Sequence, residues 1–322
     1  MKIPKDLASM AQFIASPECK NVIILTGAGI SVASGIPDFR SPGGMYDTLE
    51  PHLITATPSQ RLAMEQDPTS VVEKSMFMSN SFPYLEVRRP FILGTREKKW
   101  KATIAHRFAE SLHSRTGKLC RVYTQNIDGL YRQCTKMPLD KLVEVHGTIG
   151  DVSCESCGKT ANYDNFCDEV KISIKDIYKI DQDAPVDSKP ILCKHCGRAT
   201  VKPTTVLFGS SLPRVFFDRA TEDLPIVDLL IIAGTSLVVS PANSIAYNIP
   251  DDALRMIVNM EPVGQELGIM YGEKSKRDFF AQGPCDEVFL ELMDHLDWLD
   301  DLELIADDLP QNSVKKLRDL RK

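Results

Sequence analysis

Five short apolar runs rich in β-branched residues constrain the fold more than any other feature of this sequence. They cover residues 21–26, 119–124, 142–145, 227–233 and 254–258. Near-continuous apolar runs of this length are typical of strands in a parallel sheet that is covered on both faces. Longer segments separate them, and residues 103–114 show helical periodicity. This alternation predicts a doubly wound α/β fold with a parallel sheet.

Two stretches interrupt the alternation and predict a second, smaller module. Residues 42–99 are helical or loop-like in character, and residues 151–202 are polar and rich in cysteine. We therefore expect a Rossmann-like domain made of residues 1–41, 100–150 and 203–322, into which a helical insertion and a cysteine-rich module are inserted. Several apolar residues of the helical insertion are expected to pack in its core rather than line a ligand site: Met76, Phe77, Met78, Phe82 and Phe91.

The segment from residue 286 onwards predicts an acidic amphipathic helix that carries Trp298.

Two Cys-x-x-Cys pairs form the firmest candidate site. The four residues are Cys154, Cys157, Cys193 and Cys196. Two intervening residues let both thiolates of a pair face one ion, and two pairs supply the four soft ligands of a tetrahedral Zn²⁺ site. Residues 158–192 separate the pairs, a longer gap than the usual spacing of about 15–20, so an insertion within the ribbon is expected. Because protein would fill all four positions, we expect one structural zinc ion; a redox or disulfide role is the alternative.

Two further residues near the pairs, Cys167 and His195, are expected to stay outside the metal site, because either could bind only by displacing one of the four cysteines.

A glycine-rich loop follows the first apolar run. Gly27, Ala28 and Gly29 permit a tight turn and close approach of the backbone to a pyrophosphate. Val32 replaces the third glycine of the usual dinucleotide fingerprint, and no acidic residue ends a second strand about 20 residues later. A conventional hydride-transferring dehydrogenase is therefore disfavoured, and a glycine-rich turn without a ligand remains the alternative.

Polar residues gather where several of the predicted strands end. They are Gln125, Asn126 and Asp128, then His146, and then Gly234, Thr235 and Ser236. Ligands bind at the carboxyl ends of the strands in open α/β sheets, so these residues predict one shared site. A loop after the first strand holds Asp38, Phe39 and Arg40; it could cover a cofactor, with Arg40 meeting phosphate.

Together these residues resemble the sirtuin family of NAD-dependent protein deacylases. The resemblance covers about three quarters of the chain, in the family's order, and its cytosolic and nuclear branch is the most similar. The matching segments are GAGISVASGIPDFRSPGGMY, YTQNIDGL, VEVHGT, the two cysteine pairs, VKPTTVLFG and AGTSLVVSPAN.

The resemblance implies a reaction in which NAD is consumed and no hydride moves. The acyl-lysine carbonyl oxygen attacks the ribose carbon that bears nicotinamide, and the products are nicotinamide, O-acyl-ADP-ribose and free lysine. His146 would act as general base, for which a neutral imidazole is suited at physiological pH. Asn126 and Asp128 would orient the cofactor.

The resemblance also implies the residues that hold the ligands. Cofactor contacts would come from Gly27, Ala28, Gly29, Asp38, Phe39, Arg40, Gln125, Asn126, Asp128, Gly234, Thr235, Ser236, Asn259, Glu261 and Cys285. The peptide would lie as an extended strand against Val206, Leu207, Phe208, Gly209 and Val238, paired to the backbone of residues 206–209 and 236–239.

The chain departs from the family pattern at several positions. Ser210 stands where the family usually has Glu, and the family's Pro before the helix that carries His106 is absent, with Lys101-Ala102 in its place. Members that remove succinyl groups carry a Tyr and an Arg in the helical insertion, and a rough alignment puts Ser75 and Met78 at those positions. An apolar acyl pocket is therefore expected, which favours acetyl or longer apolar acyl groups over acidic ones.

Charge and composition bound the remaining functions. A net charge of -6 gives no global basic field for nucleic acid or for an anionic membrane, and the cysteine-rich module carries several acidic residues. No apolar run approaches the roughly 20 residues that span a bilayer, and residues 1–11 lack an apolar signal core. We expect a cytoplasmic or nuclear protein that acts on acylated-lysine proteins, of open oligomeric state.

Three alternatives remain beside deacylation: a mono-ADP-ribosyltransferase, a non-catalytic NAD sensor, and a zinc-ribbon module for nucleic acid fused to a degenerate nucleotide fold. The last predicts basic and aromatic residues around the cysteine pairs, whereas that segment is acidic.

Overall fold

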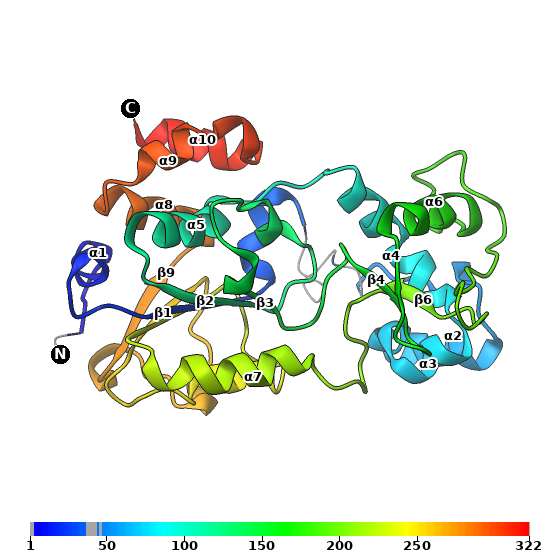
Figure 1. Cartoon of the computed structure of the whole chain (residues 1–322), viewed down its shortest axis with the longest axis horizontal. Helices are drawn as coiled ribbons and strands as arrows, with labels where there is room; N and C mark the ends of the chain where they lie inside the picture. Colours follow the sequence, from blue (N-terminus) through cyan, green and yellow to red (C-terminus); the bar gives the residue numbers. More distant parts are fainter. Residues whose placement is uncertain (1–2, 37–43, 45–46, 322) are drawn as a thin grey trace.

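The computed structural model describes residues 3–36, 44 and 47–321, which form a larger and a smaller lobe side by side (Figure 1). In this described part, six parallel strands build the sheet of the larger lobe in the order β3-β2-β1-β7-β8-β9. They are β1 (Val22–Thr26), β2 (Leu119–Thr124), β3 (Leu142–Glu144), β7 (Leu229–Ala233), β8 (Leu254–Asn259) and β9 (Asp278–Gln282). This is the strand order of a Rossmann-type sheet, so the predicted fold class is confirmed.

Each of the five predicted apolar runs coincides with one of these strands to within two residues, and β9 is the strand that the apolar runs did not reveal. It lies at the edge of the sheet and begins with Asp278, a charged residue that is buried beside Arg255 of β8. The guanidinium of Arg255 neutralises this carboxylate across the sheet, a pairing that hydrophobic periodicity does not reveal.

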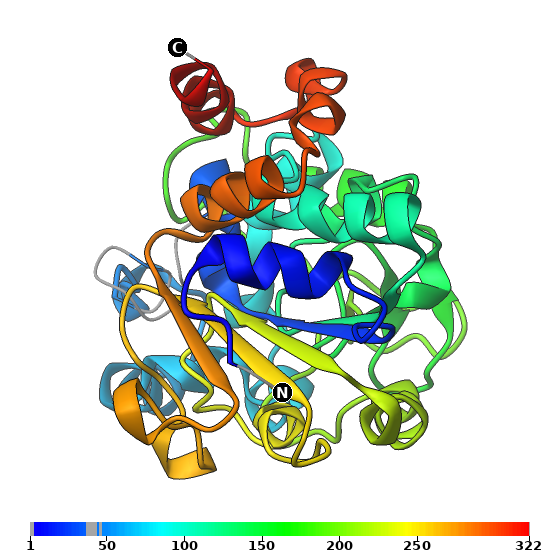
Figure 2. The ribbon, with the colours of Figure 1, turned by 90° about the vertical axis from the view of Figure 1, so that its left-hand side faces the viewer.

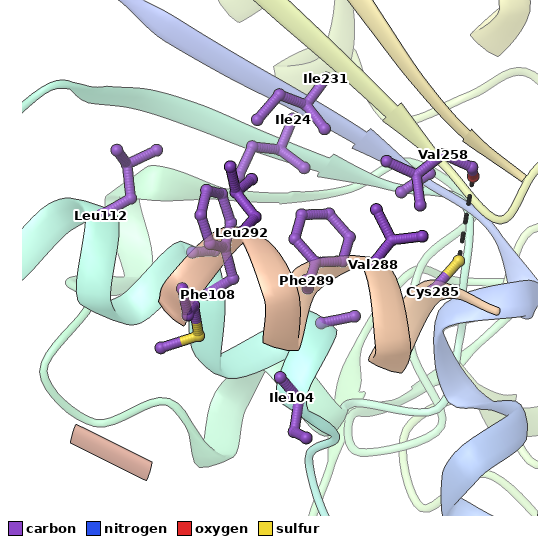
Figure 3. Close-up of a cluster of buried hydrophobic side chains, with 14 of the residues drawn as sticks. Ile24, Ile104, Phe108, Leu112, Ile231, Val258, Cys285, Val288, Phe289 and Leu292 are labelled. Carbon is purple, nitrogen blue, oxygen red and sulfur yellow. Dashed lines mark hydrogen bonds between the residues drawn. The ribbon is translucent and has the colours of Figure 1, made fainter. Parts of the chain in front are cut away.

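Helices cover both faces of the sheet, which explains why the strands are apolar on both sides. One face packs against α1 (Leu7–Ala15), α5 (Ile104–Thr116) and α8 (Cys285–His295), and α7 (Arg214–Asp223) lies on the other (Figures 1 and 2). In Figure 3, Phe108 of α5 and Phe289 of α8 pack against the face that carries Ile24, with their ring centroids 4.9 Å apart. The neighbouring Ile23 faces the opposite cluster, because successive side chains of a strand point to opposite faces.

Helix α5 confirms the helix predicted over residues 103–114. Thr103 and His106 form a capping box at its start, in which the Thr103 N–H donates to Nδ1 of His106 at 3.2 Å. The helix ends at Gly117, which has a left-handed φ of +68° and donates its N–H to the His113 carbonyl.

The single amphipathic helix predicted from residue 286 is wrong. The structure has α8, α9 (Leu299–Glu303) and α10 (Gln311–Leu320) in this segment. The helical conformation is interrupted after α8 at Asp297, whose φ is +58°. A second interruption comes before α10, which Pro310 precedes. Trp298 lies at the first break and is buried against α5.

The smaller lobe combines the two stretches that interrupt the strand pattern. It contains α2 (Pro58–Gln66), α3 (Lys74–Ser79), α4 (Phe82–Arg96) and α6 (Tyr163–Ser173), with a small antiparallel sheet of β4 (Val152–Cys154), β5 (Thr160–Ala161) and β6 (Val201–Pro203). One hydrophobic cluster joins Phe77 and Tyr84 of the first stretch to Phe166 and Val170 of the second. The two stretches therefore share a core. We propose the domain boundaries at residues 41, 99, 150 and 202 on this basis.

The apolar residues predicted for the core of the helical insertion mostly pack there. Met76 and Phe77 are buried, and Phe82 and Phe91 are partly buried against the same cluster. Met78 is the exception, with 38% of its surface exposed.

Among the helices of residues 3–36 and 47–321, none is both long and apolar enough to cross a membrane.

Candidate active site and metal centre

Four cysteine thiols converge at one end of the smaller lobe. Cys154, Cys157, Cys193 and Cys196 bring their sulfur atoms within 4.8 Å of one another. The Sγ atoms of Cys154 and Cys196 are 3.6 Å apart, and those of Cys157 and Cys193 are 3.8 Å apart. These separations are too long for a disulfide bond and suit four thiolates around one ion.

The two halves of this centre are built alike. Gly158 donates its N–H to the Cys154 carbonyl at 2.8 Å, and Gly197 donates to the Cys193 carbonyl at 2.9 Å. Both glycines are left-handed, with φ of +70° and +71°, which favours glycine after each pair. Two matching turns with thiolates facing inward fit a closed tetrahedral Zn²⁺ site, so the structure supports one structural zinc ion.

Cys167 and His195 are not part of the cysteine cluster found among the described residues. Cys167 lies on α6 and is fully buried, and burial raises the pKa of its thiol to about 11. His195 contributes its backbone N–H to Sγ of Cys193 at 3.4 Å.

The glycine-rich loop lies where the strand order switches direction, between β1 and β7. Gly27 and Gly29 follow β1, and Gly234 follows β7. A Cβ atom on Gly29 would lie 2.6 Å from Cα of Gly234, and one on Gly234 would lie 2.7 Å from Cα of Gly29. The two loops are therefore packed backbone to backbone at the carboxyl edge of the sheet, the position at which open α/β sheets bind nucleotides.

A cavity of about 550 Å³ opens beside these loops. Its wall includes several of the predicted site residues: Ala28, Gln125, Asn126, His146, Val206, Leu207, Phe208, Gly209, Gly234, Thr235 and Ser236. Gln125 accepts a hydrogen bond from the Thr235 hydroxyl at 2.8 Å, which fixes its amide, yet its Nε2 is buried without a hydrogen-bond partner in the described structure. A ligand hydroxyl in the cavity would satisfy this amide group.

His146 lies in the wall of the same cavity, two residues after the end of β3. Its Nδ1 lies 2.9 Å from the carbonyl oxygen of Gln125. Because a carbonyl oxygen can only accept, Nδ1 carries the proton and Nε2 keeps its lone pair. Burial lowers the pKa of the His146 imidazole below its usual value, although the hydrogen bond to Gln125 opposes this shift. The neutral ring is thus the form present at physiological pH.

The residue after His146 has to be glycine. Gly147 has a φ of +71°, and a Cβ atom there would lie 2.1 Å from the carbonyl oxygen of Thr204. This close approach allows the His146 carbonyl to accept the N–H of Val206 at 2.8 Å, so the segment expected to bind peptide is attached directly to the His146 loop.

Asn126 and Asp128 are linked through Ser31, a residue that the sequence did not single out. Asn126 Nδ2 donates to the Ser31 hydroxyl at 3.1 Å and to the Gly27 carbonyl at 3.0 Å. The Ser31 hydroxyl donates in turn to Asp128 at 2.6 Å. All three side chains are buried, and burial raises the pKa of the Asp128 carboxyl. Asp128 lies in the wall of a different depression from Asn126, so it reaches the main cavity only through Ser31 and Asn126.

The segment 206–209 offers only one of its edges to a peptide. The N–H of Val206 is used by His146, and Phe208 pairs with Val72 and Lys74 on the same side. The Leu207 carbonyl accepts the N–H of Ser210 at 3.0 Å, and Gly209 has a left-handed φ of +84°, so the extended part of the segment ends at Phe208. Val238 is 64% exposed and lies next to the cavity-lining Val239.

A second cavity, of about 540 Å³, lies on the other side of the glycine-rich loop. Gly29, Asn259 and Cys285, three of the expected cofactor contacts, meet in its wall. Asn259 Nδ2 donates to the Thr235 carbonyl at 3.2 Å, and Sγ of Cys285 points at the Val258 carbonyl (Figure 3). Glu261 is exposed and is not part of this wall. The predicted Asp38, Phe39 and Arg40 lie outside the described residues.

The His146 cavity is lined by other residues than those from which the sequence predicts an apolar acyl pocket. Neither Ser75 nor Met78 belongs to the wall of the His146 cavity, which instead includes Tyr84 and Arg88 of α4. Arg88 is only 6% exposed, and the Tyr84 hydroxyl is hydrogen-bonded to Thr205 at 2.6 Å. Helix α4, and not α3, therefore contributes to the wall of this cavity.

Ser210, which stands at the family's usual Glu position, also lines this cavity, and its hydroxyl is buried without a hydrogen-bond partner among the described residues.

Comparisons with known proteins agree with this geometry. The chain is 33% identical over 311 residues to NAD-dependent protein deacetylase sirtuin-2 of Danio rerio. The aligned region covers 92% of this chain and 73% of that protein. It is 34% identical over 301 residues to NAD-dependent deacetylase sir2C of Dictyostelium discoideum (91% and 60%). It is 31% identical over 306 residues to NAD-dependent protein deacetylase hst2 of Schizosaccharomyces pombe (94% and 80%). The model of the Sir2 family matches residues 27–241, a span that includes the glycine-rich loop, His146 and all four cysteines, and the chain therefore belongs to the Sir2 family.

Proposed function

We propose that this chain is an NAD-dependent protein-lysine deacetylase that yields nicotinamide, O-acyl-ADP-ribose and free lysine. One observation carries the proposal: His146 turns a basic, unprotonated nitrogen away from Gln125 in a cavity that also holds Asn126 and the carboxyl ends of β1 and β7. The deacetylase names of its relatives support the same reaction.

The two cavities on either side of the glycine-rich loop suggest how NAD would be held. Gly27, Ala28 and Gly29 would contact the pyrophosphate, because they form the tight turn after β1 at the carboxyl edge of the sheet, where open α/β sheets bind nucleotides. Gln125 has a buried amide ready for a ribose hydroxyl, and Asn259 and Cys285 belong to the adenosine end. When bound, NAD supplies a weak bond between nicotinamide and ribose at which the acetyl-lysine oxygen can react.

His146 would act as the general base. Its Nδ1 is occupied by the Gln125 carbonyl, so a proton taken from a ribose hydroxyl can go only to Nε2. The hydrogen bond also fixes the tautomer and the orientation of the ring.

Asn126 and Asp128 would have different roles. Asn126 lines the cavity and is positioned to touch the ligand, whereas Asp128 holds Asn126 through the hydroxyl of Ser31. We therefore propose Asn126 as a ligand-binding residue and Asp128 as a positioning residue.

The acetylated peptide would enter between residues 206–209 and 236–239, which border the cavity. Their backbone groups would pair with an extended peptide and demand little of its sequence. The zinc centre is closed and would not take part in the chemistry; it stabilises the small sheet whose β6 leads into this segment.

The acyl group would reach towards Tyr84 and Arg88. A buried guanidinium is a good partner for a carboxylate, so the cavity does not exclude acidic acyl groups as the sequence suggested. We expect Arg88→Met to lower the rate of succinyl removal relative to acetyl removal from one peptide by about tenfold, the effect of losing roughly 1.4 kcal/mol of transition-state binding. An unchanged ratio would show that Arg88 does not contact the acyl group.

The proposal implies a class of protein substrate and a cellular compartment. Acetylated proteins, histones or others, are the expected substrates, and a cytoplasmic or nuclear location fits the acidic chain with unpaired cysteines.

The test compares the unaltered protein with His146→Ala on an acetyl-lysine peptide with NAD. We expect nicotinamide release and deacetylation from the unaltered protein and a loss of about 10²–10⁴-fold in the variant, the usual contribution of a general base. NAD binding by calorimetry should be nearly unchanged in the variant. Inactivity of the unaltered protein despite NAD binding would favour a sensor, and ADP-ribosylated protein without deacetylation would favour a transferase.

A further inference from the structure

The C-terminal helix α10 forms part of the cavity at the proposed adenosine end of the NAD site. This cavity is bounded by η1 (Ala28–Ser34), by the end of β8 and by the turn before α8. Asn312, Lys315, Lys316 and Asp319, all from α10, complete its wall. Figures 1 and 2 show α10 as the last helix of the chain, lying over the face of the sheet that carries α5 and α8.

One face of α10 anchors the helix to the larger lobe. Ser313 is fully buried and donates its hydroxyl to Asp286 of α8 at 2.5 Å. Asp286 also accepts the N–H of Ala105 from α5 at 3.2 Å, so one buried carboxylate joins three helices. Leu317, four residues after Ser313 and hence on the same face, is buried in the main hydrophobic cluster. The position of α10 relative to the turn before α8 is therefore well defined.

A neighbouring face of α10 borders the cavity. Residues 312, 315, 316 and 319 follow the spacing that places side chains along one stripe of a helix. Lys316 pairs with Glu287 of α8, whereas Lys315 takes part in none of the ion pairs found between described residues. Lys315 therefore adds a positive charge to the wall of a cavity that begins at Gly29, where the pyrophosphate of NAD would lie.

We propose that α10 is the outer wall of the adenosine subsite, and that it sets the affinity for NAD without contributing to the reaction. The inference rests on the proposed function, because it assumes that NAD occupies both cavities. The opposite side of the subsite is supplied by Val32, Met260 and Pro284, whose apolar surfaces suit the flat face of adenine. The amide of Asn312 and the ammonium group of Lys315 would face the polar edge of the nucleoside and its phosphates.

The matched residues of the family model end at residue 241, so this wall lies outside that span. The part of the proposed NAD site that α10 contributes would thus lie in a C-terminal segment that the family match does not include.

The experiment measures ADP-ribose binding by calorimetry for the unaltered protein and three variants. The first lacks residues 311–322, the second is Lys315→Glu, and the third, Arg318→Glu, makes the same charge change on the same helix at a position that does not border the cavity. We expect binding to weaken about tenfold or more in the shortened protein, roughly threefold to tenfold in Lys315→Glu, and less than twofold in Arg318→Glu.

Enzyme kinetics give a second readout that a purely structural role would not produce. The KM for NAD should rise in the first two variants, whereas kcat at saturating NAD, the KM for the peptide and inhibition by nicotinamide should stay unchanged. Equal affinities in Lys315→Glu, Arg318→Glu and the unaltered protein would overturn the role of α10, even if the shortened protein proves unstable. Failure of the unaltered protein to bind ADP-ribose would contradict the proposed function itself.

Discussion

Replacing Ser31 with alanine tests whether the buried Asn126–Ser31–Asp128 network positions the active site. The Ser31 hydroxyl is the group that both other side chains share: it receives a hydrogen bond from Asn126 at 3.1 Å and donates one to Asp128 at 2.6 Å. Alanine has nearly the same volume at this buried position, so the change removes the hydroxyl and leaves little cavity.

The expected loss follows from the type of hydrogen bond. A hydrogen bond to a charged group contributes about 1.5–3 kcal/mol, and Asp128 would retain the Leu130 N–H as its donor. The free energy of unfolding should fall by about that amount. If Asn126 loses its orientation to the same extent, kcat should fall by roughly tenfold to hundredfold, because each 1.36 kcal/mol changes a rate tenfold.

The assay determines kcat and KM for NAD together with stability in urea. Ser34→Ala is the matched control, since Ser34 lies on the same 3₁₀ helix but accepts a hydrogen bond from Lys101 on the outside of the loop. We expect Ser34→Ala to leave kcat nearly unchanged. A Ser31→Ala protein that is less stable but keeps the full kcat would refute the positioning role and leave the network a structural one.

Three further predictions concern the zinc centre, the base and the glycine beside it. Cys193→Ser should lower the bound zinc below one ion per chain and reduce Tm, whereas Cys167→Ser should keep the zinc, as elemental analysis can check. Burial lowers the pKa of His146, so its basic form persists to lower pH than for a free histidine; the acid limb of kcat/KM should therefore have its midpoint below the pKa of about 6.5 of a free histidine, and a midpoint above pH 7 would contradict this. Gly147→Ala should destabilise the protein by roughly 1–3 kcal/mol more than Gly117→Ala in urea unfolding, because both positions have positive φ but only the first would bring a Cβ against a carbonyl oxygen.

The sheet was predictable because its strands are buried on both faces. Residues 119–124 coincide with β2, and residues 254–258 lie within β8. The edge strand β9 was missed because its first residue is charged and its partner Arg255 lies on another strand. The C-terminal helices were predicted as one helix, since amphipathic periodicity does not reveal the interruptions at Asp297, which has a left-handed φ, and at Pro310 before α10.

The sequence predicted which site residues follow the ends of strands. It did not predict the direction in which their side chains point. Sequence position put Asn126 and Asp128 in one loop, but only the fold shows that Asn126 lines the cavity and Asp128 lies behind it. Helix α4 shows the same limit. Its charged residues Glu86 and Arg89 are buried because Ser188 and Asp181 satisfy them from the distant second stretch, and this burial brings Arg88 to the cavity.

The central claim is that NAD is consumed to remove an acetyl group from lysine, and a stoichiometry measurement tests it most directly. The zinc-loaded protein is incubated with NAD and an acetyl-lysine peptide, and the released nicotinamide and the deacetylated peptide are quantified together. We predict equal amounts of the two products, and neither product when NAD is omitted or the lysine is not acetylated. Deacetylated peptide formed without NAD, or nicotinamide released while the acetyl group stays on the peptide, would contradict the account.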